Sequence, residues 1–300
     1  MLDISRLRRR AAFIQAIRQY FINQGFVEVD TPIRIPAPAP EAHIVPEVCG
    51  SWFLQTSPEL CMKRLLAAGS PPLFQICKCF RRSERGDRHL PEFTMLEWYR
   101  TGCDYLELMA DCEQLLLFLA DFFHMGNVIR VGGHTVALKP PWERLTVAEA
   151  FRRHAPQSLD QSLANGTFAE MLCIYIEPQL GIDGPVFLQD YPAELGSLAR
   201  NKESDPNVAE RFELYVGGIE LANGFSELTD SVEQRQRFVQ EQNTIQALGR
   251  QPGPMPENFL AALDRLEKTA GIALGVDRLA MVLWDVASIN EVVTFIPEEL

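Results

Sequence analysis

A short loop rich in arginine holds the residues whose types most directly suggest chemistry. Four arginines and His89 lie within residues 80–90, between two apolar stretches. Guanidinium groups are permanent cations that bind phosphate oxygens in pairs, so the loop predicts a site for a polyanion such as a nucleoside triphosphate. The same loop also fits an exposed hairpin whose arginines pair with acidic neighbours, namely Glu84, Asp87 and Glu92.

The residues after this loop alternate as in a β-strand. Phe93, Met95, Glu97 and Tyr99 fall on one face by the two-residue period of a strand. That face carries an aromatic ring, a carboxylate and a phenol. The combination suits an adenine ring followed by a substrate with an amino group.

A second acidic segment, residues 213–227, has the pattern of two strands joined by a Gly-Gly pair. A two-residue hairpin turn there would place Tyr215 opposite Glu220, with Glu213 diagonal to it on the same face. Two carboxylates at that separation can bind Mg²⁺ together with phosphate oxygens. An exposed acidic strand fits the same residues.

Three further polar or aromatic residues, Asn223, Phe225 and Glu227, have the opposite parity on the second of these strands. A β-bulge near residues 222–224 would let both sets of side chains line one pocket. Without such a bulge, this second set would face away from Glu220.

Two expected helix starts each carry a charged residue. Residues 275–278 place Arg278 in the first turn of a helix after a glycine, where the backbone can approach a ligand and the helix field favours phosphate. The same residues fit an ordinary helix start with Asp277 as the N-cap and Arg278 in solvent. Glu59, just after Ser57, either interacts with its own helix dipole or binds a substrate ammonium.

The elements that would position these residues are expected to form one domain over residues 1–300. Apolar periodicity and capping residues predict helices over 5–24, 58–68, 105–123, 233–248, 257–270 and from 277 onward. Strand patterns cover 26–29, 52–55, 73–80, 93–99, two runs within 208–229, and 273–274. We therefore expect an α+β fold, a mostly antiparallel sheet flanked by helices, with 127–193 as a peripheral insertion.

Composition excludes several classes of protein. The net charge is −12, which argues against a broad nucleic-acid surface, and no window is apolar enough to predict a membrane span or a secretory signal. The seven cysteines are scattered, and the only close pair, Cys77 and Cys79, has neither zinc-site nor redox-motif spacing. Reduced thiols in the cytoplasm are the expectation.

Taken in order, these segments resemble the catalytic core of the class II aminoacyl-tRNA synthetases over almost the whole chain. Residues 25–32 are similar to the first class motif, 80–97 to the second and 275–278 to the third. The strings HLPEFTMLE (89–97) and ELANGFSE (220–227) are close to signatures of the lysine branch. The resemblance implies ATP as substrate, Mg²⁺ and a homodimer formed through the first motif.

Departures from the lysine branch refine this expectation. Lysyl-tRNA synthetases precede the first motif with an anticodon-binding domain, whereas here that motif begins almost at residue 1, so no anticodon recognition is expected. The chain thus resembles the lysyl-tRNA synthetase paralogues that activate (R)-β-lysine with ATP and transfer it to a lysine of elongation factor P. Ala273, where the synthetases have glycine, agrees with β-lysine; Ser83 and Leu90 replace residues used near ATP.

The resemblance also implies residue roles. Arg81 and Arg278 are expected to be catalytic, with Arg81 on the α-phosphate and the substrate carboxylate. The expected ATP contacts are Arg81, Glu84, His89, Phe93, Glu220, Leu221, Gly275 and Arg278. Glu213 and Glu220 are expected to hold Mg²⁺. The expected contacts to lysine or (R)-β-lysine are Ser57, Glu59, Glu97, Tyr99, Asn223, Phe225, Glu227 and Ala273.

Two alternatives remain open from the sequence. One is a minimal synthetase-like enzyme that acts on tRNA or a small amine, although the acidic balance opposes tRNA binding. The other is a non-catalytic synthetase-like module that binds or regulates. This chain retains nearly all the carboxylates and arginines that the resemblance assigns to ligand binding, which favours an enzyme over that module.

Overall fold

An eight-stranded sheet organises the molecule, which a computed structural model describes over residues 1–300. The strand order is β1-β5-β6-β13-β12-β11-β10-β9. The two outermost pairs, β1 with β5 and β9 with β10, are parallel, and the pairs between them are antiparallel. The expected α+β fold with a mostly antiparallel sheet is confirmed.

The strands and helices have these bounds. The main sheet consists of β1 (Val27–Glu28), β5 (Leu73–Phe80), β6 (Glu92–Thr101), β9 (Glu143–Thr146), β10 (Val186–Pro192), β11 (Val208–Val216), β12 (Ile219–Ser226) and β13 (Thr269–Gly275). Smaller sheets consist of β2 (Arg34–Ile35), β3 (Val48–Cys49) and β4 (Trp52–Leu54), and of β7 (Val128–Val131) and β8 (His134–Ala137). The longer helices are α1 (Ile4–Asn23), α2 (Glu59–Ala67), α3 (Tyr105–Phe122), α4 (Val147–His154), α7 (Ser231–Ala247), α8 (Glu257–Leu263) and α9 (Val276–Trp284). Short helices are α5 (Leu159–Ala164), α6 (Phe168–Met171), a π-helical turn (Leu172–Ile176) and four 3₁₀ turns (Glu177–Gln179, Ala193–Leu195, Ile289–Glu291 and Pro297–Glu299).

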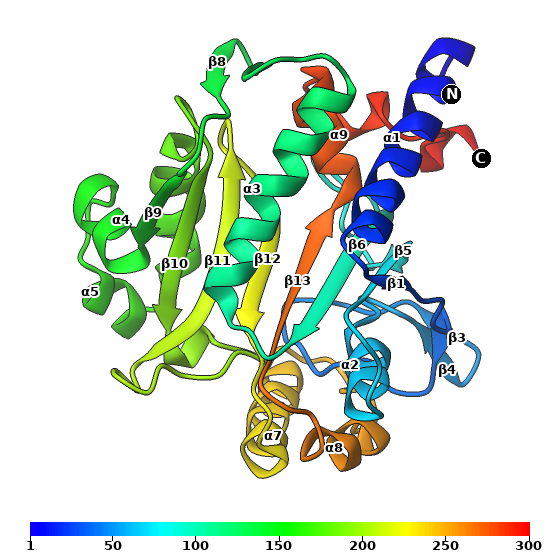
Figure 1. Ribbon diagram of the computed structural model, residues 1–300. Helices are drawn as coiled ribbons and strands as arrows, with labels where there is room; N and C mark the ends of the chain where they lie inside the picture. The colour runs from blue at the N-terminus through cyan, green and yellow to red at the C-terminus, as the bar shows by residue number, and fades with distance from the viewer.

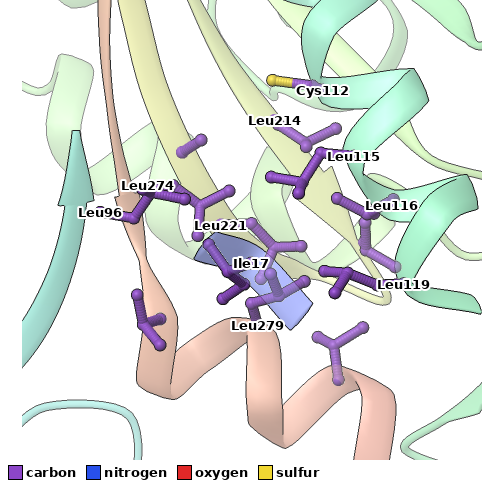
Figure 2. Packing of buried hydrophobic residues seen from close by; sticks show 14 of the residues in the cluster. Ile17, Leu96, Cys112, Leu115, Leu116, Leu119, Leu214, Leu221, Leu274 and Leu279 are labelled. Atoms are coloured by element: carbon purple, nitrogen blue, oxygen red, sulfur yellow. The ribbon is translucent and has the colours of Figure 1, made fainter. Parts of the chain in front are cut away.

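One face of the sheet is covered by helices and forms the main core. In Figure 1, α3 runs across this face, with α1 and α9 beside it. Leucines of α3 pack against Leu214, Leu221 and Leu274 of the central strands, as Figure 2 shows. Because strand residues alternate between faces, this packing commits the other half of each central strand to the opposite side. The site residues lie on that opposite side.

A lower layer closes one end of the sheet. Helices α2, α7 and α8 gather there, below β5, β6 and β13 in Figure 1. Their apolar side chains form a second cluster that includes Leu60, Tyr99, Phe238 and Phe259. This cluster fixes the start of α2, where Ser57 and Glu59 were expected to act, against strand β6.

Most expected elements agree with the structure to within a few residues, and two differences have physical causes. Helix α1 is capped by Asp3, whose side chain accepts the Arg6 N–H, so the helix begins one residue before the expected start at residue 5. Helix α8 ends at Leu263, so the second half of the predicted 257–270 helix is partly strand β13. That strand is buried on both faces, and its continuous apolar run carries no alternation that distinguishes it from helix.

The segment 127–193, expected to be a peripheral insertion, carries the β7–β8 hairpin and supplies strands β9 and β10 to the edge of the main sheet. Helices α4 and α5 lie outside this edge in Figure 1. None of the helices in the structure combines the length and apolar character needed to cross a membrane.

Candidate active site

A cavity of about 480 Å³ lies on the sheet face opposite α3. All predicted site residues except Glu227 border it; they come from the start of α2, the arginine loop, strands β6, β11, β12 and β13, and the start of α9. The structure therefore brings together residues that lie up to about two hundred positions apart in the sequence, because β13 pairs with β6 on one side and with β12 on the other. Ser83 and Leu90 replace residues that the lysine synthetases use near ATP. Leu90 borders the cavity and Ser83 does not.

Arg81 is the cation of this cavity that has no partner. Its guanidinium carbon lies 5.1 Å from the ring centre of Phe93, and it forms no ion pair. Its buried Nε atom also makes no hydrogen bond. A buried guanidinium nitrogen without an acceptor costs free energy, so this position is suited to an anion.

Arg278 enters the cavity from the first turn of α9. It donates to Oε2 of Glu220 at 3.0 Å and to the backbone oxygen of the same residue at 3.1 Å, and it contacts Nε2 of His89. Burial, followed by the charges of Arg278 and two further arginines, lowers the pKa of His89 to about 4. At neutral pH the imidazole is therefore uncharged and can donate or accept a hydrogen bond beside the guanidinium.

The acidic end of the cavity is built on Glu97, whose side chain is fully buried. Ser57 donates to one carboxylate oxygen at 2.7 Å and Tyr99 donates to the other at 2.8 Å. Burial, followed by the charge of Glu59, raises the pKa of Glu97 to about 8. Strand geometry separates Glu97 from Phe93 by about 13 Å, since the two residues lie four positions apart on β6.

Cross-strand pairing aligns the rest of this end. Ala273 of β13 lies directly opposite Glu97 on one side and Asn223 of β12 on the other, and Asn223 in turn lies opposite Glu213 of β11. In an antiparallel sheet, such partners point to the same face. One row across four strands therefore contributes a carboxylate, a methyl group, an amide and a second carboxylate to the cavity wall.

Glu227, predicted to bind substrate, is buried behind this wall and does not border the cavity. Its carboxylate forms an ion pair with Lys63, which also pairs with Glu59, four residues earlier on α2. Burial opposes the charge of Lys63, but the carboxylates of Glu227 and Glu59 raise its pKa overall. The internal lysine takes the place next to Glu227 that the sequence had assigned to a substrate ammonium.

The backbone of Gly271 lies in close contact with side chains behind this wall. A Cβ atom at this position would overlap the Tyr99 ring and a carboxylate oxygen of Glu227. Only glycine leaves room for both groups behind the row that contains Ala273.

A β-bulge brings both parities of β12 to the cavity, as expected, but one residue before the predicted range. Tyr215 pairs with Glu220 while Leu214 pairs with Ala222, so Leu221 is the extra residue. Its side chain packs in the main core in Figure 2, and the residue also borders the cavity. Glu220 and the Asn223–Phe225 pair thus line one wall together.

Glu213 is held by three donors in the structure. Arg211 donates to its Oε1 at 2.7 Å, and the hydroxyls of Tyr191 and Tyr215 donate to Oε2 at 2.6 and 2.7 Å. Burial, followed by the charge of Glu220, raises its pKa. The two carboxylates therefore lie close enough to repel, which is the arrangement that a shared cation relieves. The structure has no group of three or more His, Cys, Asp or Glu side chains arranged to hold a metal ion.

Sequence reasoning missed several charged residues of the site, among them Glu194 and Glu241, which also border the cavity. Lys63 follows Glu59 by four residues on an expected helix, a spacing that signals an ion pair. Arg211 precedes Glu213 by two residues on a strand, hence on the same face, and it also donates to Asn223 at 3.1 Å. Glu41 borders the cavity from a proline-rich stretch without periodicity, so no local signal could have found it.

Comparison with known proteins decides the family. A family model described as tRNA synthetases class II (D, K and N) matches residues 4–299. The chain belongs to this class II synthetase family. The segments that resemble the three class motifs lie around β1, in the arginine loop with β6, and at the start of α9.

Curated relatives within this family share one name, elongation factor P–(R)-β-lysine ligase. The relative from Pectobacterium atrosepticum is 40% identical, with 98% of this chain and 95% of the relative covered. Those from Edwardsiella ictaluri and Klebsiella pneumoniae are 38% and 39% identical, each with 97% of this chain and 95% of the relative covered. The likeness thus extends over the whole cavity and the sheet that carries it.

The raised carboxyl pKa values in this synthetase cavity predict a pH dependence. Glu97 has a pKa of about 8, and burial raises that of Glu41 to about 7, so both groups lose a proton as pH rises through these values. A protonated carboxyl attracts an ammonium weakly, so the Kd for a diamino acid should fall as pH rises from about 6 to about 8. Isothermal titration calorimetry across this range checks the expectation, and a flat profile would contradict it.

Proposed function

We propose that this chain is an ATP-dependent ligase with one catalytic domain. It activates (R)-β-lysine as an aminoacyl-adenylate and transfers the aminoacyl group to a lysine side chain of elongation factor P. The observation that carries the proposal is the unpaired Arg81 at one end of a cavity whose other end is walled by carboxylates. An anionic nucleotide beside a dicationic amino acid matches that charge pattern, and the relatives' shared name supports the substrate pair.

In this reaction, a substrate carboxylate oxygen attacks the α-phosphorus of ATP and pyrophosphate leaves. The acceptor amine then attacks the acyl carbon, and AMP leaves. We assign to Arg81 the stabilisation of negative charge on the α-phosphate as the first bond forms. No covalent nucleophile of the protein is needed, because positioning and electrostatics lower the barrier.

The nucleotide is assigned to the arginine end of the cavity. Phe93 offers a ring face for adenine, and Arg278 is placed to contact adenine or the γ-phosphate once it exchanges its pairing with Glu220. His89, Glu84, Leu221 and Gly275 border the same region. A neutral His89 beside Arg278 adds a hydrogen-bonding group without adding charge.

Magnesium fits the carboxylates of Glu213 and Glu220, which would hold it together with phosphate oxygens. Mg²⁺ commonly takes one or two protein carboxylates and keeps other positions for water and substrate. Bound there, the ion neutralises charge on the phosphates. The mutual repulsion of the two carboxylates supports this assignment.

The amino acid is assigned to the row formed by Glu97, Ala273 and Asn223, with Ser57, Tyr99 and Phe225 around it. Ionised Glu97 would receive the far ammonium. Glu59 would receive the ammonium near the carboxylate. Glu227 then acts indirectly, because its ion pair with Lys63 supports the position of Glu59.

We also propose that the chain forms a homodimer through the segment around α1 and β1. Exposed apolar side chains support this surface: Ile22, Val27 and Ile33 are 54, 47 and 43% exposed. Analytical ultracentrifugation tests it, and a monomer at micromolar concentration would refute it.

The proposed function is tested by incubating the pure protein with ATP, Mg²⁺, (R)-β-lysine and elongation factor P. The expected result is a mass gain of one lysyl group on the factor, together with pyrophosphate exchange that depends on the amino acid. Exchange without a mass gain on the factor would leave amino-acid activation standing and refute this acceptor.

Replacing Ala273 with glycine should shift the amino-acid preference. The methyl group lies between Glu97 and Asn223, where it limits how the first carbons of the substrate sit. One methyl group in a pocket is worth about 1–3 kcal/mol, so the ratio of kcat/KM for α-lysine over (R)-β-lysine should rise by roughly 10-fold or more. Pyrophosphate exchange with both amino acids measures the ratio, and no change would exclude this methyl group as the discriminating contact.

A further inference from the structure

The segment between β2 and β3 gives the cavity a carboxylate without a partner. Glu41 borders the cavity with its three successors in the chain, residues 42–44. Its side chain makes no hydrogen bond or ion pair in the structure, whereas Glu97, Glu213 and Glu220 each accept from neighbouring donors. Among the acidic groups on the wall, Glu41 is therefore one that accepts no hydrogen bond from the protein.

The segment that presents Glu41 is fixed from two sides. The backbone N–H of Ala42 donates to Oε2 of Glu241 on α7 at 2.6 Å, and Arg250 donates to the backbone oxygen of Ala42. On the other side, the backbone N–H of Arg82 donates to the oxygen of Val45 at 2.7 Å. Glu41 is thus held at the cavity by contacts of its neighbours, and its own carboxylate remains available.

Glu41 shares the cavity with Glu59 and Arg81. Burial raises its pKa, and the strongest charge contribution comes from Glu59, followed by the opposing influence of Arg81. Because the three side chains border one cavity of about 480 Å³, a single ligand can contact all of them. Two neighbouring carboxylates repel each other, and a cation between them removes the repulsion.

The second carboxylate of this pair is only partly satisfied. Glu59 accepts from Lys63 through Oε1, and no donor reaches its Oε2. Its side chain is 13% exposed, so the remaining oxygen can reach a ligand in the cavity. A cation held by Glu41 and Glu59 would lie next to a carboxylate held by Arg81.

We propose that Glu41 and Glu59 together bind the ammonium nearest the carboxylate of the amino acid, which makes Glu41 a specificity-determining residue. The proposal rests on amino-acid activation in this cavity, the function proposed above. In (R)-β-lysine one ammonium ends the chain and the other lies near the carboxylate, so the first is assigned to Glu97 and the second to this pair. A substrate without the nearer ammonium would leave the two carboxylates uncompensated.

The variant Glu41→Gln tests the proposal in the full-length protein, because it removes the charge and keeps the shape. Pyrophosphate exchange should show a KM for (R)-β-lysine raised by about 10- to 100-fold, since one of two charged partners is lost. The KM for ATP and the melting temperature should stay close to wild type. The matched control is Glu47→Gln, on the same segment but outside the cavity, which should behave as wild type.

A ligand without the nearer amine separates recognition from a general effect. 6-Aminohexanoate keeps the carboxylate and the far ammonium, and its inhibition constant should be no weaker in Glu41→Gln than in wild type. Three results would each overturn the proposal. They are an unchanged KM for (R)-β-lysine, a KM for ATP that rises as much as that for (R)-β-lysine, and an inhibition constant for 6-aminohexanoate that rises as much as the KM for (R)-β-lysine. A wild-type chain without exchange for any diamino acid would instead refute the proposed function itself.

Discussion

Replacing Arg81 with alanine is expected to lower amino-acid-dependent pyrophosphate exchange by about 10²- to 10³-fold, the usual loss when a preorganised donor to transition-state charge is removed. Arg81 has no ion pair and its buried Nε has no acceptor, so the folded protein loses little when it is removed. The loss should therefore appear in kcat/KM, with the melting temperature nearly unchanged. Exchange kinetics and differential scanning calorimetry measure the two quantities.

The neighbouring Arg82 provides the matched control. Its side chain is exposed and does not border the cavity, and its backbone N–H, which alanine retains, makes the bond to Val45. Arg82→Ala should therefore keep exchange within a few-fold of wild type. Equal losses in both variants would show that the loop needs general positive charge rather than a guanidinium at residue 81.

Replacing Lys63 with methionine is expected to lower the free energy of unfolding by about 3–5 kcal/mol, the cost of removing one partner from a buried ion pair. Lys63 is 1% exposed and pairs with both Glu59 and Glu227, so methionine would leave two carboxylates without a counter-charge. The carboxylates would then take up protons, so the defect should be smaller in acid than at alkaline pH. Urea unfolding at several pH values measures both effects.

Two further variants define the cause of this loss. Lys78→Met removes a lysine whose 3.5 Å pair with Glu92 is exposed, and should cost less than about 1 kcal/mol. Adding Glu227→Gln to Lys63→Met should restore part of the stability, because one uncompensated charge disappears. Failure of that rescue would indicate that lost packing of the lysine stem, rather than charge, destabilises the protein.

Local pattern was sufficient for most of the fold and for the residues that gather at the cavity. The alternation of residues 93–99 correctly predicted that Phe93, Glu97 and Tyr99 share a face, because packing of Leu96 and Trp98 against the helices fixes the parity. The motif order also predicted that Arg278 enters the cavity. Their roles in binding and catalysis remain predictions.

Long-range pairing accounts for what the sequence could not predict. The carboxylate of Glu227 was expected at the substrate, but a lysine from a different element neutralises it. Charge pairing between distant elements leaves no periodic trace along the chain. Glu41 was overlooked for a similar reason, since its position depends on contacts between its loop and α7.

The unpaired Leu221 makes the length of β12 as important as its composition. The two parts of this strand are out of phase by one residue, which is why Glu220 and Asn223 face the same way. Inserting one residue between them would turn Asn223 and Phe225 toward α3 and present Ala222 to the cavity, whereas deleting Leu221 would remove the bulge and leave Glu220 and Asn223 on one face. The binding wall of β12 therefore tolerates substitution of single side chains better than it tolerates an added residue.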